Sequence, residues 1–171
     1  MDIRVRVGEA TFIARAGAVI VRDGATLLAQ NDREQCFYTV GGAIELGEVA
    51  EASLHRELRE ELGVEAVSCS LVAVQENFWA RRSPSDDPPA ERGSLIHELH
   101  FFFRVELPEN FTIDPDHIDP DAHTKVHESF VWVPLGDLPQ LTVFPAFLAD
   151  LAAADPDAGI RHLVTHEDGP E

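Results

Sequence analysis

The sequence predicts an α/β protein in which a mixed β-sheet is packed between helices. Short segments rich in apolar and β-branched residues, typical of strands, occur on both sides of one long segment with a helical period. A second helical segment follows near the C-terminus. This order favours a sheet covered by helices. The 171 residues contain no internal repeat or linker, so we expect a single domain over residues 1–171.

The N-terminal part is expected to form strands. Apolar side chains first alternate with polar ones, and β-branched residues are frequent afterwards. Asp23-Gly24 is a turn signal between two such segments, and Gly41-Gly42 ends the last one. The expected strands lie at residues 3–7, 12–21, 25–29 and 37–40.

Residues 49–62 have a helical period. Leu54, Leu58 and Leu62 recur at intervals of four residues and form one apolar stripe. Gly63 follows directly, in the position where a left-handed residue commonly ends a helix. The sequence therefore predicts a helix that ends at Leu62.

The rest of the chain alternates between strands and polar loops. We expect strands at residues 64–74, 96–107 and 130–133, a proline-containing loop at about 80–95, a helix at 144–154 and a flexible tail at 165–171. In the strand at 96–107, Leu99 and Phe103 share one face, whereas Glu98 and His100 share the other. His97 and His100 face opposite ways, so they do not form a zinc-binding pair.

The composition is that of a soluble globular protein with an excess of acid. The net charge of −18 repels nucleic acid and anionic membranes, so neither is expected as a partner. An anionic small substrate fits if metal ions supply positive charge. Cys36 and Cys69 are too few for a disulfide scaffold, and neither a secretory signal nor a membrane-spanning apolar run is present. We therefore expect a cytoplasmic protein.

Three glutamates of the predicted helix are candidates for metal binding. Glu57, Glu60 and Glu61 fall within one arc of the helix, where their like charges repel one another. Mg²⁺ and Mn²⁺ prefer oxygen ligands, and carboxylates at this spacing suit them. Taken alone, however, the three glutamates favour a merely solvated acidic face.

The residues around these glutamates form a longer motif. Starting at Gly42, the segment GAIELGEVAEASLHRELREELGV matches the pattern GX5EX7REUXEEXGU, with U an apolar residue, at every position. This pattern is the Nudix box, so the sequence resembles the Nudix hydrolase family. The segment Trp132-Val133-Pro134-Leu135, followed by a helix, is also similar to the family. The resemblance implies an α/β/α sandwich around a mixed β-sheet.

The resemblance also implies roles for the matching residues. The metal-binding glutamates correspond to Glu57, Glu60 and Glu61, with Glu60 and Glu61 as direct ligands and Glu57 as a ligand or the general base. Arg56 is expected to hold the box together through carboxylate contacts, although helix geometry points it away from the acidic arc. Glu48 is expected to orient or cap rather than to bind metal.

Further site residues are expected outside the helix. The Gly41 carbonyl is a candidate metal ligand because glycine lets the backbone approach closely. The family often takes another acidic ligand from a later segment, and Glu98 is our candidate, with an ordinary edge carboxylate as the alternative. Candidates for binding phosphates or a base, with surface or core roles as the alternatives, are Arg81, Arg82, Phe78 and Trp79.

The predicted activity is the metal-dependent hydrolysis of a pyrophosphate linkage in a small nucleotide-like diphosphate. Bound Mg²⁺ or Mn²⁺ neutralises the phosphates and activates water, and a carboxylate takes the proton. We favour nucleoside or deoxynucleoside triphosphates, with ADP-ribose, nucleotide sugars and dinucleoside polyphosphates as alternatives. The alternatives from other classes are a non-catalytic nucleotide sensor and an isopentenyl diphosphate isomerase-like enzyme that uses a cysteine such as Cys36. A homodimer through the edge of the N-terminal strand is a further expectation.

Overall fold

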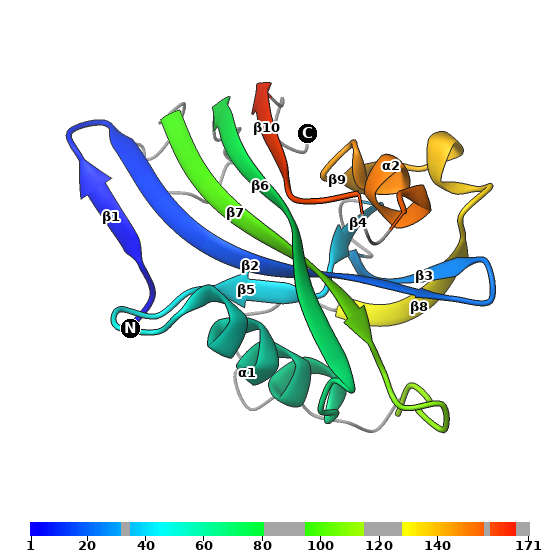
Figure 1. Cartoon of the computed structure of the whole chain (residues 1–171). Helices are drawn as coiled ribbons and strands as arrows, with labels where there is room; N and C mark the ends of the chain where they lie inside the picture. Colours follow the sequence, from blue (N-terminus) through cyan, green and yellow to red (C-terminus); the bar gives the residue numbers. More distant parts are fainter. Residues whose placement is uncertain (32–34, 81–94, 115–127, 156–157, 167–171) are drawn as a thin grey trace.

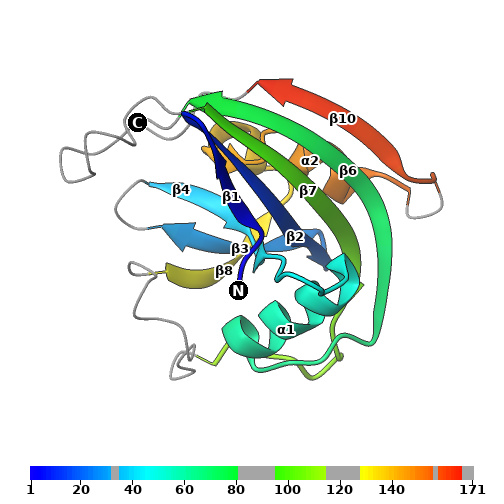
Figure 2. The same cartoon turned by 90° about the vertical axis from the view of Figure 1, so that its left-hand side faces the viewer.

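The computed structural model describes residues 1–31, 35–80, 95–114, 128–155 and 158–166, and in this part of the chain it contains a ten-stranded mixed sheet. The sheet curls strongly, with α1 below it and α2 on its other side (Figure 1). Figure 2 shows β10, β6 and β7 arching along one side of the molecule. The predicted sheet packed between helices is confirmed. The candidates Arg81 and Arg82, and most of the predicted loop at 80–95, lie outside the described residues.

The strands include all those expected from the sequence, with shifted ends. The first five are β1 (Arg4–Val7), β2 (Ala10–Arg22), β3 (Ala25–Asn31), β4 (Cys36–Thr39) and β5 (Gly41–Ala43). The others are β6 (Ser68–Ala80), β7 (Leu95–Glu106), β8 (Glu128–Pro134), β9 (Val143–Phe144) and β10 (Arg161–His166). The helices are α1 (Ala50–Leu62), α2 (Leu148–Ala153) and a short 3-10 helix, η2 (Leu138–Gln140).

The long strand β2 organises the sheet. It pairs in parallel with β7 along one side, and antiparallel with β1, β5 and β3 along the other. Beyond β7 the sheet continues with β6, antiparallel, and then β10, parallel to β6. The strand β2 therefore lies between β5, which precedes α1, and β7, which comes from much later in the chain.

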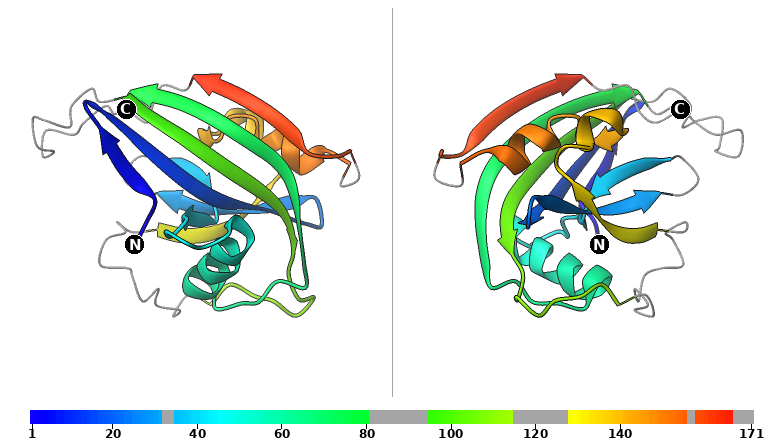
Figure 3. Two further views of the ribbon diagram at one scale, coloured as in Figure 1. Left: turned by 60° about the vertical axis from the view of Figure 1, so that its left-hand side comes forward. Right: turned by 90° about the vertical axis from the view of Figure 1, so that its right-hand side faces the viewer.

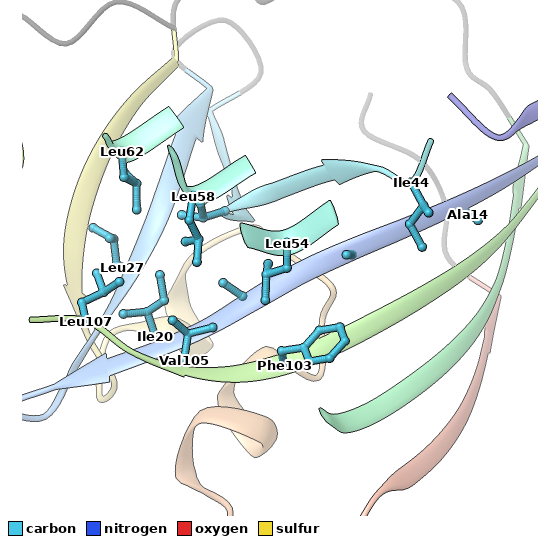
Figure 4. Close-up of a cluster of buried hydrophobic side chains, with 13 residues drawn as sticks. Ala14, Ile20, Leu27, Ile44, Leu54, Leu58, Leu62, Phe103, Val105 and Leu107 are labelled. Atoms are coloured by element: carbon cyan, nitrogen blue, oxygen red, sulfur yellow. The ribbon is translucent and has the colours of Figure 1, made fainter. Parts of the chain in front are cut away.

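The helix α1 packs its leucines on one face of the sheet, as predicted. Leu54 and Leu58 are fully buried, and Leu62 is nearly so. They lie against Ile20 of β2 and Phe103 of β7 (Figure 4). Burial of each leucine contributes roughly 1.5–3 kcal/mol relative to exposure. This packing fixes the rotation of α1 and therefore the direction of its glutamates.

The helix α1 ends at Gly63, which has the predicted left-handed conformation with φ 64°. Its N–H donates to the Arg59 carbonyl at 3.0 Å and so closes the last turn. Replacing Gly63 with alanine forces an L side chain into this conformation, and we expect a loss of about 1 kcal/mol in the free energy of unfolding. Chemical denaturation measures this loss. Gly136→Ala is the control, because a Cβ at Gly136 meets nothing within 4 Å. Equal stability of the two variants would contradict this account of the helix end.

The second helix covers the opposite face of the sheet. Figure 3 shows α2 from two further directions. Leu148 and Leu151 of α2 pack against Val19 of β2 and Phe102 of β7, the alternate residues to those that contact α1. The predicted helix at 144–154 is wrong at its start, because α2 begins at Leu148. Residues 143–144 instead form β9, which pairs in parallel with β4. The backbone before a proline is disfavoured in the helical region, and Phe144 precedes Pro145.

The C-terminal segment also differs from the prediction. The expected flexible tail at 165–171 is wrong for Thr165 and His166, which belong to β10 and pair with β6. The Gln75 amide donates to the Thr165 hydroxyl at 2.7 Å, and that hydroxyl donates to Asn77 Oδ1 at 2.6 Å. Residues 167–171 lie outside the described part of the chain. None of the described helices is long and apolar enough to cross a membrane.

Candidate functional site

A pocket of about 550 Å³ gathers most of the candidate residues that the structure describes. It is lined by carboxylates of α1, the glycines of β5, and polar side chains of β2, β6 and β7. The predicted site residues that line it are Gly41, Arg56, Glu57, Glu60, Glu61, Trp79 and Glu98. A volume of this size suits a nucleotide-sized ligand, since small-molecule sites typically measure ~300–1,000 Å³.

Two of the α1 carboxylates are held close to the backbone of β5. Glu57 and Glu61 are 6% and 5% exposed, respectively. The Gly41 N–H donates to Glu61 Oε2 at 3.0 Å. A Cβ on Gly42 would overlap the Glu57 carboxylate, and one on Gly41, which has φ +137°, would overlap β2. The two glycines therefore allow β5 to lie directly against the acidic side of α1.

Arg56 joins the carboxylates of the box. Its Nη1 donates to Glu57 Oε1 at 2.7 Å and to Glu60 Oε2 at 3.0 Å. Its Nε and Nη2 donate to the two oxygens of Glu48, both at 3.1 Å. The expectation that Arg56 points away from the acidic arc is wrong, because its long side chain turns back to reach the next residue and the next helical turn.

The Glu48 carboxylate lies just before α1 and is 18% exposed. Burial alone would raise its pKa, but hydrogen bonds from Arg56 and from the Glu45 N–H outweigh burial and lower the pKa below 4.5. Hydrogen bonds to Glu48 and Glu57, and the negative charges of these residues, raise the pKa of Arg56 despite its own burial. Glu48 therefore stays ionised and anchors Arg56, which is the arrangement expected of an orienting residue.

The polar face of β7 forms another wall of the pocket. Glu98 is 8% exposed, and its Oε1 lies 3.6 Å from Arg15 Nε. His100 also lines the pocket, and burial together with the charge of Arg15 lowers its pKa well below 6.5, so it is neutral at pH 7. Arg15 is a functional candidate that the sequence analysis missed. Its only signal in the sequence is that side chains of a strand alternate between the two faces of the sheet, so Arg15 faces the opposite side from the buried Ala14 and Ala16.

The aromatic candidates on β6 have different positions. Trp79 lines the pocket, as a residue that stacks on a base must. Phe78 points away, with its ring stacked on His97 at 4.4 Å and on His166 at 5.2 Å. Phe78 is therefore not among the residues that line this pocket, because neighbouring residues of a strand face opposite sides of the sheet, and its position fits the alternative role away from the substrate. The same alternation separates His97 from His100, as predicted.

Several polar and aromatic lining residues carry no local signal in the sequence. Strand register places Gln75 beside His100, and Asn77 beside Glu98. Other missed residues that line the pocket include Arg4, Tyr38, Thr39, Phe144 and Pro145. Cys36, the cysteine considered for an isomerase, is buried next to the Tyr38 hydroxyl at 3.3 Å and is not among the lining residues described.

The donor set of the pocket suits a hard divalent cation. Glu57, Glu60 and Glu61 offer carboxylate oxygens, and one guanidinium, that of Arg56, serves two of them together with Glu48. Glu60 is the most exposed of the three glutamates, with 27% of its side chain accessible to solvent. Oxygen-rich sites of this kind bind Mg²⁺ or Mn²⁺ in preference to softer metals.

The sequence is similar to a known protein family and to a curated protein. A family model described as the NUDIX domain matches residues 11–154. The CTP pyrophosphohydrolase of Escherichia coli (strain K12) is 45% identical over 66 residues, which cover 36% of this chain and 49% of that protein. The chain thus matches about half the length of this curated relative.

Solved structures show the same architecture. A mutator MutT protein from Bacillus halodurans superposes with a TM-score of 0.62 at 14% identity, covering 92% of this chain and 91% of that one. A MutT NUDIX hydrolase from Burkholderia pseudomallei gives a TM-score of 0.56 at 25% identity, covering 84% and 98%. At 14% identity, the likeness to the Bacillus halodurans protein supports the fold alone.

Proposed function

Because the chain belongs to the Nudix hydrolase family, we propose that it cleaves nucleoside or deoxynucleoside triphosphates to a monophosphate and pyrophosphate, with Mg²⁺ or Mn²⁺ as cofactor. The observation that carries the proposal is the position of Glu57, Glu60 and Glu61 in one nucleotide-sized pocket. Nudix hydrolases act on small nucleotide-like molecules and use divalent metal ions.

The pocket contains the two kinds of groups that a nucleotide requires. Its acidic side suits metal-bound phosphates, and the basic residues Arg4 and Arg15 also line it. Its other walls present Trp79, which offers a flat ring for a base, and Gln75, which offers an amide. A nucleoside triphosphate carries both a charged chain and a flat base, so it matches this division.

In the proposed reaction, a water oxygen bonds to one phosphorus atom while the bridging P–O bond breaks and its electron pair leaves with the other phosphate group. Bound Mg²⁺ or Mn²⁺ would neutralise the phosphates and increase the acidity of water. A carboxylate of the cluster accepts the proton, and Glu57 is the candidate base because Gly42 and Arg56 fix it in place. Arg56 positions Glu57 and Glu60, and the Gly41 N–H positions Glu61.

Among the triphosphates, CTP is the first to test, since the curated relative is named for it. ADP-ribose, nucleotide sugars and dinucleoside polyphosphates share the same linkage and belong in the panel as alternatives. One structural neighbour is titled an ADP-ribose pyrophosphatase, but its identity of 15% makes it a likeness of fold.

The test is an assay of purified protein with this panel in Mg²⁺, in Mn²⁺ and in excess chelator. With triphosphates we expect monophosphate and pyrophosphate, so that inorganic phosphate appears only after pyrophosphatase is added. The rate should fall to background in chelator and return with either metal. Hydrolysis in ¹⁸O-labelled water then identifies the phosphorus that is attacked, by showing which product carries the label.

Three results would contradict parts of the proposal. A full rate in excess chelator would exclude the metal mechanism. Turnover of ADP-ribose or a nucleotide sugar, without hydrolysis of the triphosphates, would show that the proposed substrate is wrong but that the proposed type of reaction is right. Tight nucleotide binding without any product in either metal would make the chain a nucleotide sensor instead.

A further inference from the structure

A second group of metal-ligating side chains lies outside the pocket. It consists of Glu51 and His55 of α1 and Cys69 of β6, whose ligand atoms all lie within 4.8 Å of one another. None of the three lines the pocket described above. We refer to this group as the α1–β6 cluster.

Local structure brings the α1–β6 cluster together. Glu51 and His55 are four residues apart, so they share one face of α1 on consecutive turns. Cys69 is the second residue of β6 and packs against the hydrophobic core beneath the helix. Glu51 is exposed, whereas His55 and Cys69 are partly buried. An ion can therefore reach the cluster from solvent without unfolding the core.

We propose that the α1–β6 cluster binds a Zn²⁺-like transition metal ion, held by the Cys69 thiolate, a His55 ring nitrogen and a Glu51 carboxylate oxygen. Sulfur, nitrogen and oxygen donors together are typical of Zn²⁺, which takes four ligands in tetrahedral geometry, so water would complete the set. Mg²⁺ prefers oxygen donors and rarely uses thiolate. The cluster thus differs in metal preference from the all-oxygen site in the pocket.

A further carboxylate, that of Glu65, lies near His55. The His55 Nδ1 lies 4.0 Å from Glu65 Oε2. The Glu65 carboxylate also pairs with Arg59 Nη1 at 3.1 Å. Glu65 thus lies beyond hydrogen-bond distance of His55 and is paired with Arg59, so the assignment depends on the three ligand atoms of the cluster themselves.

The environment of Cys69 argues against a reactive free thiol. Burial, aided by the negative charge of Glu51, raises the pKa of the Cys69 thiol to about 11. A thiol of this kind is protonated at pH 7 and is a poor nucleophile. A bound metal ion must displace this proton, because thiolate is the ligand form, so the raised pKa weakens metal binding at pH 7 and the proposal depends on the geometry of the cluster.

A metal ion in this cluster would tie the first half of α1 to the start of β6. The two segments are otherwise joined through the turn after Gly63 and through apolar packing. The ion would stabilise the folded chain, since the cluster does not exist in the unfolded state. This inference does not rest on the proposed reaction, and its test does not measure hydrolysis.

The experiment titrates the full chain, stripped of metal and kept reduced, with Zn²⁺ or Co²⁺ in excess Mg²⁺. The Mg²⁺ would occupy the oxygen ligands of the pocket if that site binds metal as proposed. We expect Co²⁺ to produce thiolate-to-metal absorption, and Zn²⁺ to remove it by competition. Zn²⁺ should also slow alkylation of Cys69, located by peptide mass spectrometry.

Variants separate the cluster from other metal sites. Cys69→Ser should abolish the Co²⁺–thiolate absorption, and His55→Gln should weaken Zn²⁺ binding by at least about 10-fold. Cys36→Ser is the matched control and should retain the absorption, because Cys36 lies on β4, outside the cluster. Absence of the absorption in the unaltered chain, or its persistence in Cys69→Ser, would overturn the proposal.

Discussion

Glu61→Gln is expected to lower kcat by about 10²- to 10⁴-fold while leaving the fold intact, because the proposal assigns Glu61 to metal binding and a bound metal contributes several kcal/mol to the reaction. The amide keeps an oxygen that can accept the hydrogen bond from the Gly41 N–H, so the contact between α1 and β5 survives. The substitution removes the negative charge that a divalent cation requires. Activity should therefore fall far more than stability.

Steady-state kinetics in saturating Mg²⁺ or Mn²⁺, together with thermal unfolding, measures both effects. Glu109→Gln is the control, since Glu109 is an exposed glutamate outside the pocket, and its rate should be unchanged. Glu60→Gln should behave like Glu61→Gln. A Glu61→Gln variant with normal kcat would show that Glu61 has no role in the reaction. A variant that fails to fold would show that the charge of Glu61 is needed for the stability of the fold instead.

The helix and its carboxylates are predicted well from the sequence because their signals are local. The leucine period gives the buried face of α1, and Gly63 gives its end. With the buried face fixed, the direction of Glu57 and Glu61 toward β5 follows. The alternation of β7 likewise places Glu98 and His100 together, and both line the pocket.

Residues that depend on distant strand pairing are not predictable in the same way. Arg15 and Gln75 join His100 in one row across β2, β7 and β6 only because these strands align in register. The pairing of β10 with β6 orders Thr165, which composition alone assigns to a flexible tail. The pairing of β9 with β4 likewise removes Phe144 from the predicted helix. Such contacts depend on tertiary structure, which local periodicity does not encode.

The contacts of Arg56 show where prediction from a helical wheel fails. The helical wheel gives the direction of a Cα–Cβ bond, and for a short side chain this is enough. The guanidinium of Arg56 lies several bonds further out, and the carboxylates of Glu48, Glu57 and Glu60 determine its position. The family resemblance implied these contacts correctly, whereas the geometric argument from the wheel did not.

Arg56→Ala is expected to weaken both stability and activity. The change leaves the carboxylates of Glu48 and Glu57, whose side chains alone are 18% and 8% exposed, without the guanidinium that pairs with both of them. Removing one partner of a buried ion pair typically costs ~3–5 kcal/mol, and we expect roughly 2–4 kcal/mol here because Arg56 is partly exposed. kcat should fall on the order of 10- to 100-fold, as for other residues that orient metal ligands. Arg56→Lys should recover little, since an ammonium cannot bridge three carboxylates in the same plane.

The stability loss in Arg56→Ala should depend on pH with a definite sign. The folded-state pKa of Glu48 lies below 4.5, so its contribution to stability is present above pH 4.5 and is lost as the pH falls through the folded-state pKa. Removing Arg56 removes the main cause of that shift. The difference in unfolding free energy between the variant and the unaltered chain should therefore be largest near neutral pH and shrink in acid. Urea unfolding at several pH values measures it, with Arg6→Ala, an exposed arginine of β1, as the control. A difference that stays constant into acid would show that Arg56 stabilises the box by packing rather than by pairing with Glu48.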